Sequence, residues 1–170
     1  MKINLKELSE LDDQEIFGMI QEIGLGENGF TTNFPESSFV EFKCSLPGLV
    51  EKSMGINLPD GYVRQTIYWL YIDDCPVAYG KLRHELNDRL LQYGGHVGYI
   101  VRPSERGKGY GKIFLAELVR EANRLGIIRL LITCDDTNSR SRRVVESNNG
   151  KLEDIRAGIC RYWIDSLEAN

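Results

Sequence analysis

The chain has 170 residues, of which 42% are hydrophobic and 27% are charged, and its formal net charge is −4. These values predict a single domain over residues 1–170 with a continuous core. They give no electrostatic reason to expect nucleic acid or an anionic membrane as a partner. There is no apolar signal core and no apolar run near the ~20 residues of a membrane span. Four widely spaced cysteines without a CxxC pattern favour reduced thiols and no metal site. We therefore expect a cytoplasmic protein.

The N-terminal third predicts one strand and two helices. Residues 2–8 are expected to form the strand. Asp12-x-x-Glu15 and Ser38-x-x-Glu41 have the spacing of capping boxes, in which each side chain satisfies a free backbone N–H at a helix start. Pro47 lies inside the second helix and predicts a kink or a split there. Loops are expected at residues 25–35 and 55–61.

The rest of the chain alternates strands and helices. Strands are predicted at 66–72, 77–85, 96–101, 129–134, 151–156 and 159–165, with a hairpin turn at 73–76. Helices are predicted at 109–125 and from Asn138 to about residue 148. A central hairpin and a later strand–helix–strand crossover predict a mixed α/β sheet with helices on its faces.

Residues 101–111 carry the most informative motif, VRPSERGKGYG, placed between a predicted strand and a predicted helix. Glycine lets the backbone turn tightly and approach a ligand. The free N–H groups at a helix start carry a partial positive charge and bind phosphate or pyrophosphate. Arg106 and Lys108 add positive charge. The motif therefore predicts a phosphate-type site.

Two other phosphate loops fit this segment less well. A P-loop needs GxxxxGK followed by Ser or Thr, whereas Gly107 and Gly111 are one residue too close and Ile113 follows Lys112. A dinucleotide fingerprint is GxGxxG, and this segment is GxGxG. A glycine-rich turn with only a structural role remains the alternative.

The motif resembles the R/Q-x-x-G-x-G/A signature of the GNAT (GCN5-related N-acetyltransferase) superfamily, with the preceding Val-x-Pro also matching. RHELN at 83–87 and GGHVGY at 94–99 are similar to segments of a bacterial branch of that superfamily. The resemblance implies a mostly antiparallel central sheet of six to seven strands, flanked by about four helices and splayed at the cofactor site. It also implies acetyl-CoA as acyl donor, with no metal.

The resemblance assigns the cofactor site by position. The loop backbone would hold the pyrophosphate, and the strand before it would pair with the pantetheine arm. Arg140, Arg142 and Arg143 would reach the 3′-phosphate of CoA or form a solvated helix face. The residues so assigned to the cofactor are Ile100, Val101, Arg106, Gly107, Lys108, Gly109, Tyr110, Gly111, Lys112 and Asn138.

Catalytic residues are harder to assign. Many family members place a tyrosine, as general acid, seven residues after the asparagine, and this chain has Val145 there. Tyr162 and Tyr99 are the candidate substitutes. For the general base we rank Glu85 first, then His96 and His84. Strand parity lets only one of His84 and Glu85 face the cleft.

These features predict an N-acetyltransferase acting on an amine of a small molecule or peptide. The alternatives are an inactive acyl-CoA-binding or sensing module, which Val145 favours, and a nucleotide-binding protein, which the loop spacings disfavour. The first two helices and residues 25–35 are expected to shape the acceptor pocket. Glu27, Glu36 and Glu41 would attract a cationic amine. Whether the chain is a monomer or a homodimer stays open.

Overall fold

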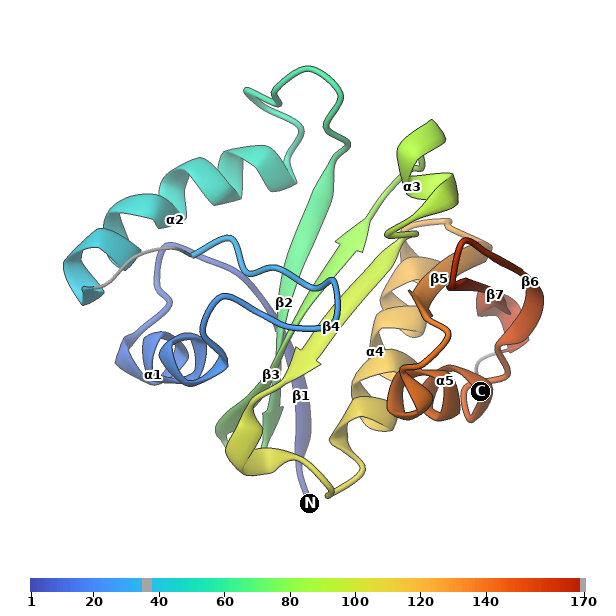
Figure 1. Cartoon of the computed structure of the whole chain (residues 1–170). Helices are drawn as coiled ribbons and strands as arrows, with labels where there is room; N and C mark the ends of the chain where they lie inside the picture. Colours follow the sequence, from blue (N-terminus) through green and yellow to red (C-terminus); the bar gives the residue numbers. More distant parts are fainter. Residues whose placement is uncertain (35–37, 169–170) are drawn as a thin grey trace.

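The chain forms two antiparallel sheets, with helices on both sides of the larger one (Figure 1). The computed structural model describes residues 1–34 and 38–168, so Glu36 lies outside the described residues. The elements are β1 (Ile3–Glu7), α1 (Gln14–Ile23), α2 (Phe39–Ser53), β2 (Gln65–Ile72), β3 (Cys75–Arg83), α3 (Asp88–Gln92), β4 (Val97–Val101), α4 (Tyr110–Arg124), β5 (Arg129–Asp135), α5 (Ser139–Glu146), β6 (Lys151–Arg156) and β7 (Ile159–Asp165).

The larger sheet has the strand order β1-β2-β3-β4, and its central hairpin sets the register. Asp73 and Asp74 both have positive φ, 47° and 67°, which is the two-residue turn that matches the twist of paired strands. The turn is shorter than the predicted 73–76. As a result β3 begins at Cys75 and ends at Arg83, so Glu85 lies beyond the strand end.

The sheet is buried on both faces, which explains why β2 reads as an unbroken apolar run. One face carries Tyr68, Leu70 and Ile72 and packs against α4. The other carries Ile67 and Trp69 and packs against α1 and α2. Burial of both faces removes the alternation of polar and apolar residues that a half-exposed strand would show.

The N-terminal helices follow the predicted pattern with one shift. Asp13, not Asp12, caps α1 and accepts from the N–H groups of Glu15 and Ile16. Asp12 instead accepts a hydrogen bond from the indole Nε1 of Trp69 at 2.7 Å, a contact across the fold that sequence spacing does not reveal. The capping box of Ser38 with Glu41 is confirmed.

A split of the helix at Pro47 is wrong, because α2 runs without interruption from Phe39 to Ser53. Pro47 lies on the exposed side of the helix, so its missing N–H costs no buried hydrogen bond. The buried side chains of Phe42 and Leu46 hold the preceding turns against the sheet.

The C-terminal half forms the crossover β4–α4–β5 and a second sheet of order β5-β7-β6. The predicted mixed fold and its antiparallel pairing are confirmed. The described residues contain five α-helices rather than about four, because the short α3 occupies the predicted polar connection before β4. The two sheets meet between β4 and β5, and this junction positions the site.

Candidate active site

A cavity of about 750 Å³ lies where β4 and β5 separate. Five residues of β4 line one side, and residues 132–135 of β5 line the other. The strands are tied together next to this opening. The N–H of His96 donates to the carbonyl of Leu131 at 2.7 Å, and Gly94 N–H donates to Thr133 Oγ1 at 2.8 Å. The predicted splay at the cofactor site is therefore present.

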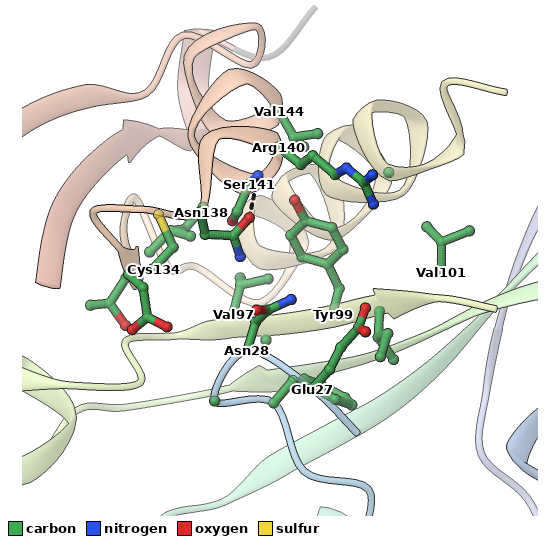
Figure 2. A pocket seen from close by; sticks show the side chains of 18 of the residues that line it. Glu27, Asn28, Val97, Tyr99, Val101, Cys134, Asn138, Arg140, Ser141 and Val144 are labelled. Atoms are coloured by element: carbon green, nitrogen blue, oxygen red, sulfur yellow. Dashed lines mark hydrogen bonds between the residues drawn. The ribbon is translucent and has the colours of Figure 1, made fainter. Parts of the chain in front are cut away.

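The side chains of β4 alternate between the two faces of the sheet. Val97, Tyr99 and Val101 rise toward α5 and the cavity between the strands, as Figure 2 shows. Gly98 and Ile100 face the side of α1 and α2. A Cβ on Gly98 would lie 3.2 Å from the ring of Phe30, so glycine lets the segment after α1 pass close over the strand. That segment crosses β3 and β4 in Figure 1.

The glycine-rich loop lines the end of the cavity at the start of α4. Gly107 and Gly109 both have φ of +82°, a left-handed conformation that glycine adopts without strain. A Cβ at either position would meet no protein atom within 4 Å. Gly109 caps α4 without any side-chain hydrogen bond to the helix start. The uncapped N–H groups fit an anionic ligand such as a pyrophosphate.

Arg106 connects this loop to two other segments. Its Nε donates to the carbonyl of Val101 at 3.1 Å, and its guanidinium pairs with Glu27 at 2.6 Å. Lys108 does not line the cavity, and its Nζ pairs with Glu105 at 2.8 Å. Of the predicted cofactor residues, the cavity lining includes Ile100, Val101, Arg106, Gly107, Gly109, Tyr110, Gly111, Lys112 and Asn138.

Helix α5 contributes its N-terminal face to the cavity. Asn138 caps the helix by accepting from Ser141 N–H at 3.1 Å, as predicted. Arg140, Ser141 and Val144 line the cavity (Figure 2). Val145, where the family resemblance placed a tyrosine, is fully buried in the core. Arg143 also lines the cavity. Arg142 does not, and it donates to the hydroxyl of Tyr162 at 3.1 Å.

The three predicted catalytic residues do not line the cavity. Glu85 is exposed beyond the end of β3. The hydroxyl of Tyr162 donates to Glu146 at 2.8 Å on the other side of α5. His96 is buried and its Nδ1 accepts from Leu131 N–H at 2.9 Å. Burial lowers the pKa of His96 to about 4, with the nearby Arg83 adding to the shift. His84, ranked third as the base, contacts Thr66 Oγ1 at 2.8 Å and does not line the cavity.

The cavity contains side chains that the sequence did not single out. Lys81 and Arg83 lie at its floor on β3, and Tyr93 follows α3 at its rim. Arg83 begins the RHELN segment but was given no role there, and no motif marks Lys81, although parity on β3 could have placed the two on one face. Cys134 is buried and also lines the cavity. Burial raises the pKa of its thiol to about 11.

The segment after α1 lines the cavity, whereas no residue of α1 or α2 does; that this segment shapes an acceptor pocket stays a prediction. Residues 27–31 line it, including Glu27. Glu41 does not, because its carboxylate accepts hydrogen bonds from Ser38 at the start of α2. The predicted attraction of a cationic amine by these carboxylates is thus weakened, since Glu27 is already paired with Arg106.

A sheet splayed around a cavity, with an uncapped glycine-rich helix start on its rim, is the architecture of an acetyltransferase domain. The chain belongs to the acetyltransferase (GNAT) family, whose family model matches residues 37–150. No curated protein sequence matches the chain significantly.

Solved structures of acetyltransferases share the fold at low sequence identity. The N-acetyltransferase PseH of Campylobacter jejuni, solved with acetyl coenzyme A, is 12% identical with a TM-score of 0.63, over 96% of this chain and 99% of that one. A probable acetyltransferase is 19% identical with a TM-score of 0.70, over 98% and 94% of the two chains. The Salmonella typhimurium enzyme that modifies the N-terminal serine of ribosomal protein L7/L12 is 17% identical with a TM-score of 0.63, over 96% and 94%.

Two further findings describe what the chain lacks within residues 1–34 and 38–168. None of the helices there is long and apolar enough to cross a membrane. The same residues hold no group of three or more His, Cys, Asp or Glu side chains that could bind a metal ion.

Proposed function

We propose that this protein moves an acetyl group from acetyl-CoA directly to an amine of a small molecule or peptide in the cytoplasm. The observation that carries the proposal is the cavity between β4 and β5, which ends at the uncapped start of α4. The basic side chains of Arg106, Lys112 and Arg140 line the same end and suit the phosphates of CoA.

The pairing of β4 supports an extended ligand beside it. β4 forms a ladder with β3 on one edge only. On the other edge, His96 and Gly94 reach β5 just before the strand begins, and the strands then separate. The backbone groups of Tyr99 and the N–H of Val101 therefore remain for the amides of the pantetheine arm and for the acetyl oxygen, whereas the Val101 carbonyl already accepts from Arg106.

The proposed reaction forms one bond and breaks one. The neutral amine nitrogen attacks the thioester carbonyl carbon, the new C–N bond forms, and the C–S bond breaks to release CoA thiolate. The nitrogen loses its proton to solvent or to a base, and the sulfur gains one. A backbone N–H of β4 would stabilise the oxygen that gains negative charge.

Tyr99 is the best-placed proton donor for the leaving sulfur. Its side chain lies in the cavity between β4 and α5 (Figure 2), whereas Val145 is buried in the core and supplies no hydroxyl there. Burial raises the pKa of Tyr99, so its hydroxyl stays protonated at neutral pH. Glu85, His96 and Tyr162 lie outside the cavity, and we assign them no contact with the reacting atoms.

An inactive acyl-CoA-binding module is the second candidate, and the burial of Val145 in the core is the observation that favours it. Thermal stability measured with acetyl-CoA, ATP and NAD tests the cofactor, and only acetyl-CoA should raise Tm. Thiol release from acetyl-CoA with a panel of amines then separates the enzyme from the module. Binding without release for every amine would contradict the proposed activity.

The same assay tests Tyr99. Tyr99→Phe should retain acetyl-CoA binding and lower kcat by about 10-fold or more, within the range for loss of a general acid. Tyr110→Phe, at the start of α4 in the same cavity, is the matched control for removal of a hydroxyl. Equal kcat in wild type and Tyr99→Phe would remove Tyr99 as the donor.

A further inference from the structure

Two basic side chains of β3 lie in the cavity without an acidic partner. Lys81 and Arg83 are two residues apart and so face the same side of the sheet. Both line the cavity on the side of the segment that follows α1. Neither forms an ion pair with any residue of the described chain. The surroundings of these two side chains therefore indicate the charge of the ligand that the cavity would bind.

Lys81 is only 5% exposed, an unusual position for an ammonium group. Its Nζ donates to the carbonyl of Thr31 at 2.5 Å. It also lies 5.0 Å from the ring centre of Phe30 and 5.6 Å from that of Tyr79. An ammonium group has three donors, so two of them have no hydrogen-bond acceptor among the described residues.

Arg83 is held in place by one end of its guanidinium group. Nη1 donates to the carbonyls of Gly94 and Gly95, both at 3.0 Å. These two glycines have positive φ, which turns their carbonyls toward the arginine. The Nε and Nη2 donors of Arg83 make no hydrogen bond within the described part of the chain. The fixed guanidinium thus presents a free donor edge close to Lys81.

The carboxylates around the cavity do not balance these charges. Glu27 pairs with Arg106, and Glu105 pairs with Lys108, both at the end near the glycine-rich loop. Asp135 lies across the cavity on β5 and pairs with neither β3 residue. Burial, together with repulsion from Arg83, lowers the pKa of Lys81 to about 7.

An unpaired buried cation destabilises a fold by several kcal/mol unless a ligand supplies the opposite charge. We propose that Lys81 and Arg83 form a subsite for an anionic group of the acceptor, a carboxylate or a phosphate. This inference rests on the proposed amine acetylation. The acceptor would then be an amino acid, a peptide end or a phosphorylated amine. Its anionic group would lie at Lys81 and Arg83 on β3, and its amine would point toward the exposed edge of β4.

Turnover with matched pairs of amines tests the preference. L-alanine is compared with L-alaninamide, and phosphoethanolamine with ethanolamine, which also separates carboxylate from phosphate. We expect kcat/KM at least 10-fold higher for an anionic member. In Lys81→Met this preference should fall toward one, because kcat/KM should fall much more for the anionic amine than for the neutral one. Lys52→Met, at the exposed end of α2, is the matched control.

Equal kcat/KM within both pairs would overturn the subsite. A Lys81→Met variant that loses activity equally with charged and neutral amines would also overturn it, because that result fits a proton-transfer or structural role. Arg83→Lys keeps the positive charge but has a shorter side chain. It should therefore reduce the preference for the anionic amine while the protein still folds.

A binding measurement separates failure of the subsite from failure of the enzyme. Calorimetry with acetate and with inorganic phosphate is run at saturating CoA, which covers the glycine-rich loop. Wild type should bind one of the anions near pH 7.5 with uptake of a proton, read from two buffers with different heats of ionisation. Lys81→Met should bind at least 10-fold more weakly and take up no proton. Equal binding by both proteins would overturn the subsite, whatever the turnover assay gives.

Discussion

His96 and Leu131 are joined by two hydrogen bonds, one through the backbone N–H of His96 at 2.7 Å and one through its ring Nδ1 at 2.9 Å. The first donates to the carbonyl of Leu131, and the second accepts from the N–H of Leu131. This pair connects the two sheets at the narrow end of the cavity. A histidine that resembles a catalytic base in the sequence is therefore a structural link at the splay.

Replacing this link should lower stability. In His96→Leu the buried N–H of Leu131 loses its acceptor, which should reduce the free energy of unfolding by about 1–3 kcal/mol. Thermal or urea unfolding measures the change. His84→Leu is the control, because the hydrogen bond of that half-buried ring to Thr66 should be worth less, about 1 kcal/mol.

The same variant should change how stability depends on pH. The pKa of His96 is about 4 in the folded protein against 6.5 when unperturbed, so the unfolded chain binds the proton first. Its contribution is fully present above pH 6.5 and is lost as pH falls toward 4, by at most about 3 kcal/mol. Wild type should thus lose more stability than His96→Leu between pH 6.5 and 4. Parallel curves would contradict this account of His96.

The glycine-rich loop should be sensitive to a single methyl group. Gly109→Ala places a side chain at φ of +82°, which should cost about 1–2 kcal/mol and weaken acetyl-CoA binding at least 10-fold. Gly126→Ala, at φ of +78° after α4 and outside the cavity, should cost similar stability without changing the affinity. Calorimetric titration of acetyl-CoA measures both. An equal loss of acetyl-CoA affinity in the two variants would show that backbone strain, and not contact of the loop with the ligand, causes the loss.

A tyrosine at position 145 should not restore a general acid. Val145 is fully buried, and its Cγ1 would lie 2.4 Å from a Cβ on Gly150, so there is no space to enlarge the side chain. Val145→Tyr should destabilise the fold by about 2 kcal/mol or more. Val144→Tyr, one residue earlier and on the cavity lining, should be tolerated better. A higher Tm for Val145→Tyr than for Val144→Tyr would contradict this packing.

Lys81 should destabilise the free protein most at low pH. The pKa of Lys81 is about 7 in the folded protein and 10.5 when unperturbed. Between these two pH values the unfolded chain therefore stays protonated while the folded protein loses the proton. Stability should therefore increase between pH 7 and about 10.5, and the full penalty applies below pH 7. The charged or titratable neighbours of Lys81 are Arg83 and Tyr79 on its own strand, and from the described part of the segment that covers it come the carbonyl of Thr31 and the ring of Phe30.

Unfolding of Lys81→Met against wild type measures this effect. The variant should be more stable by on the order of 2–4 kcal/mol at pH 7, because an apolar side chain of similar length removes the buried charge. The difference should shrink as pH approaches 10. A constant difference across that range would show that Lys81 is not titrating there.

The sequence by itself determined the features that depend on neighbouring residues. The left-handed turns at Gly107 and Gly109, the helix after them and the Asn138 cap follow from local backbone geometry, so the pattern of residues 101–111 was enough to predict the phosphate-type loop. The family followed from the same segment. The shift of the α1 cap from Asp12 to Asp13 shows the limit, since the long-range bond to Trp69 decided between two adjacent carboxylates.

Only the tertiary structure decided which distant side chains share the cavity. Burial and pairing depend on contacts across the fold, and side-chain parity alone cannot supply them. His96 connects the two sheets because β5 passes beside it. Glu85 lies outside the cavity because the hairpin turn is two residues shorter than predicted, so β3 ends at Arg83. Lys81 became a buried cation because the segment carrying Thr31 closes over it. The glycine-rich loop could be predicted from neighbouring residues, whereas the rest of the cavity is assembled from β3, β4, β5, α5 and the segment after α1.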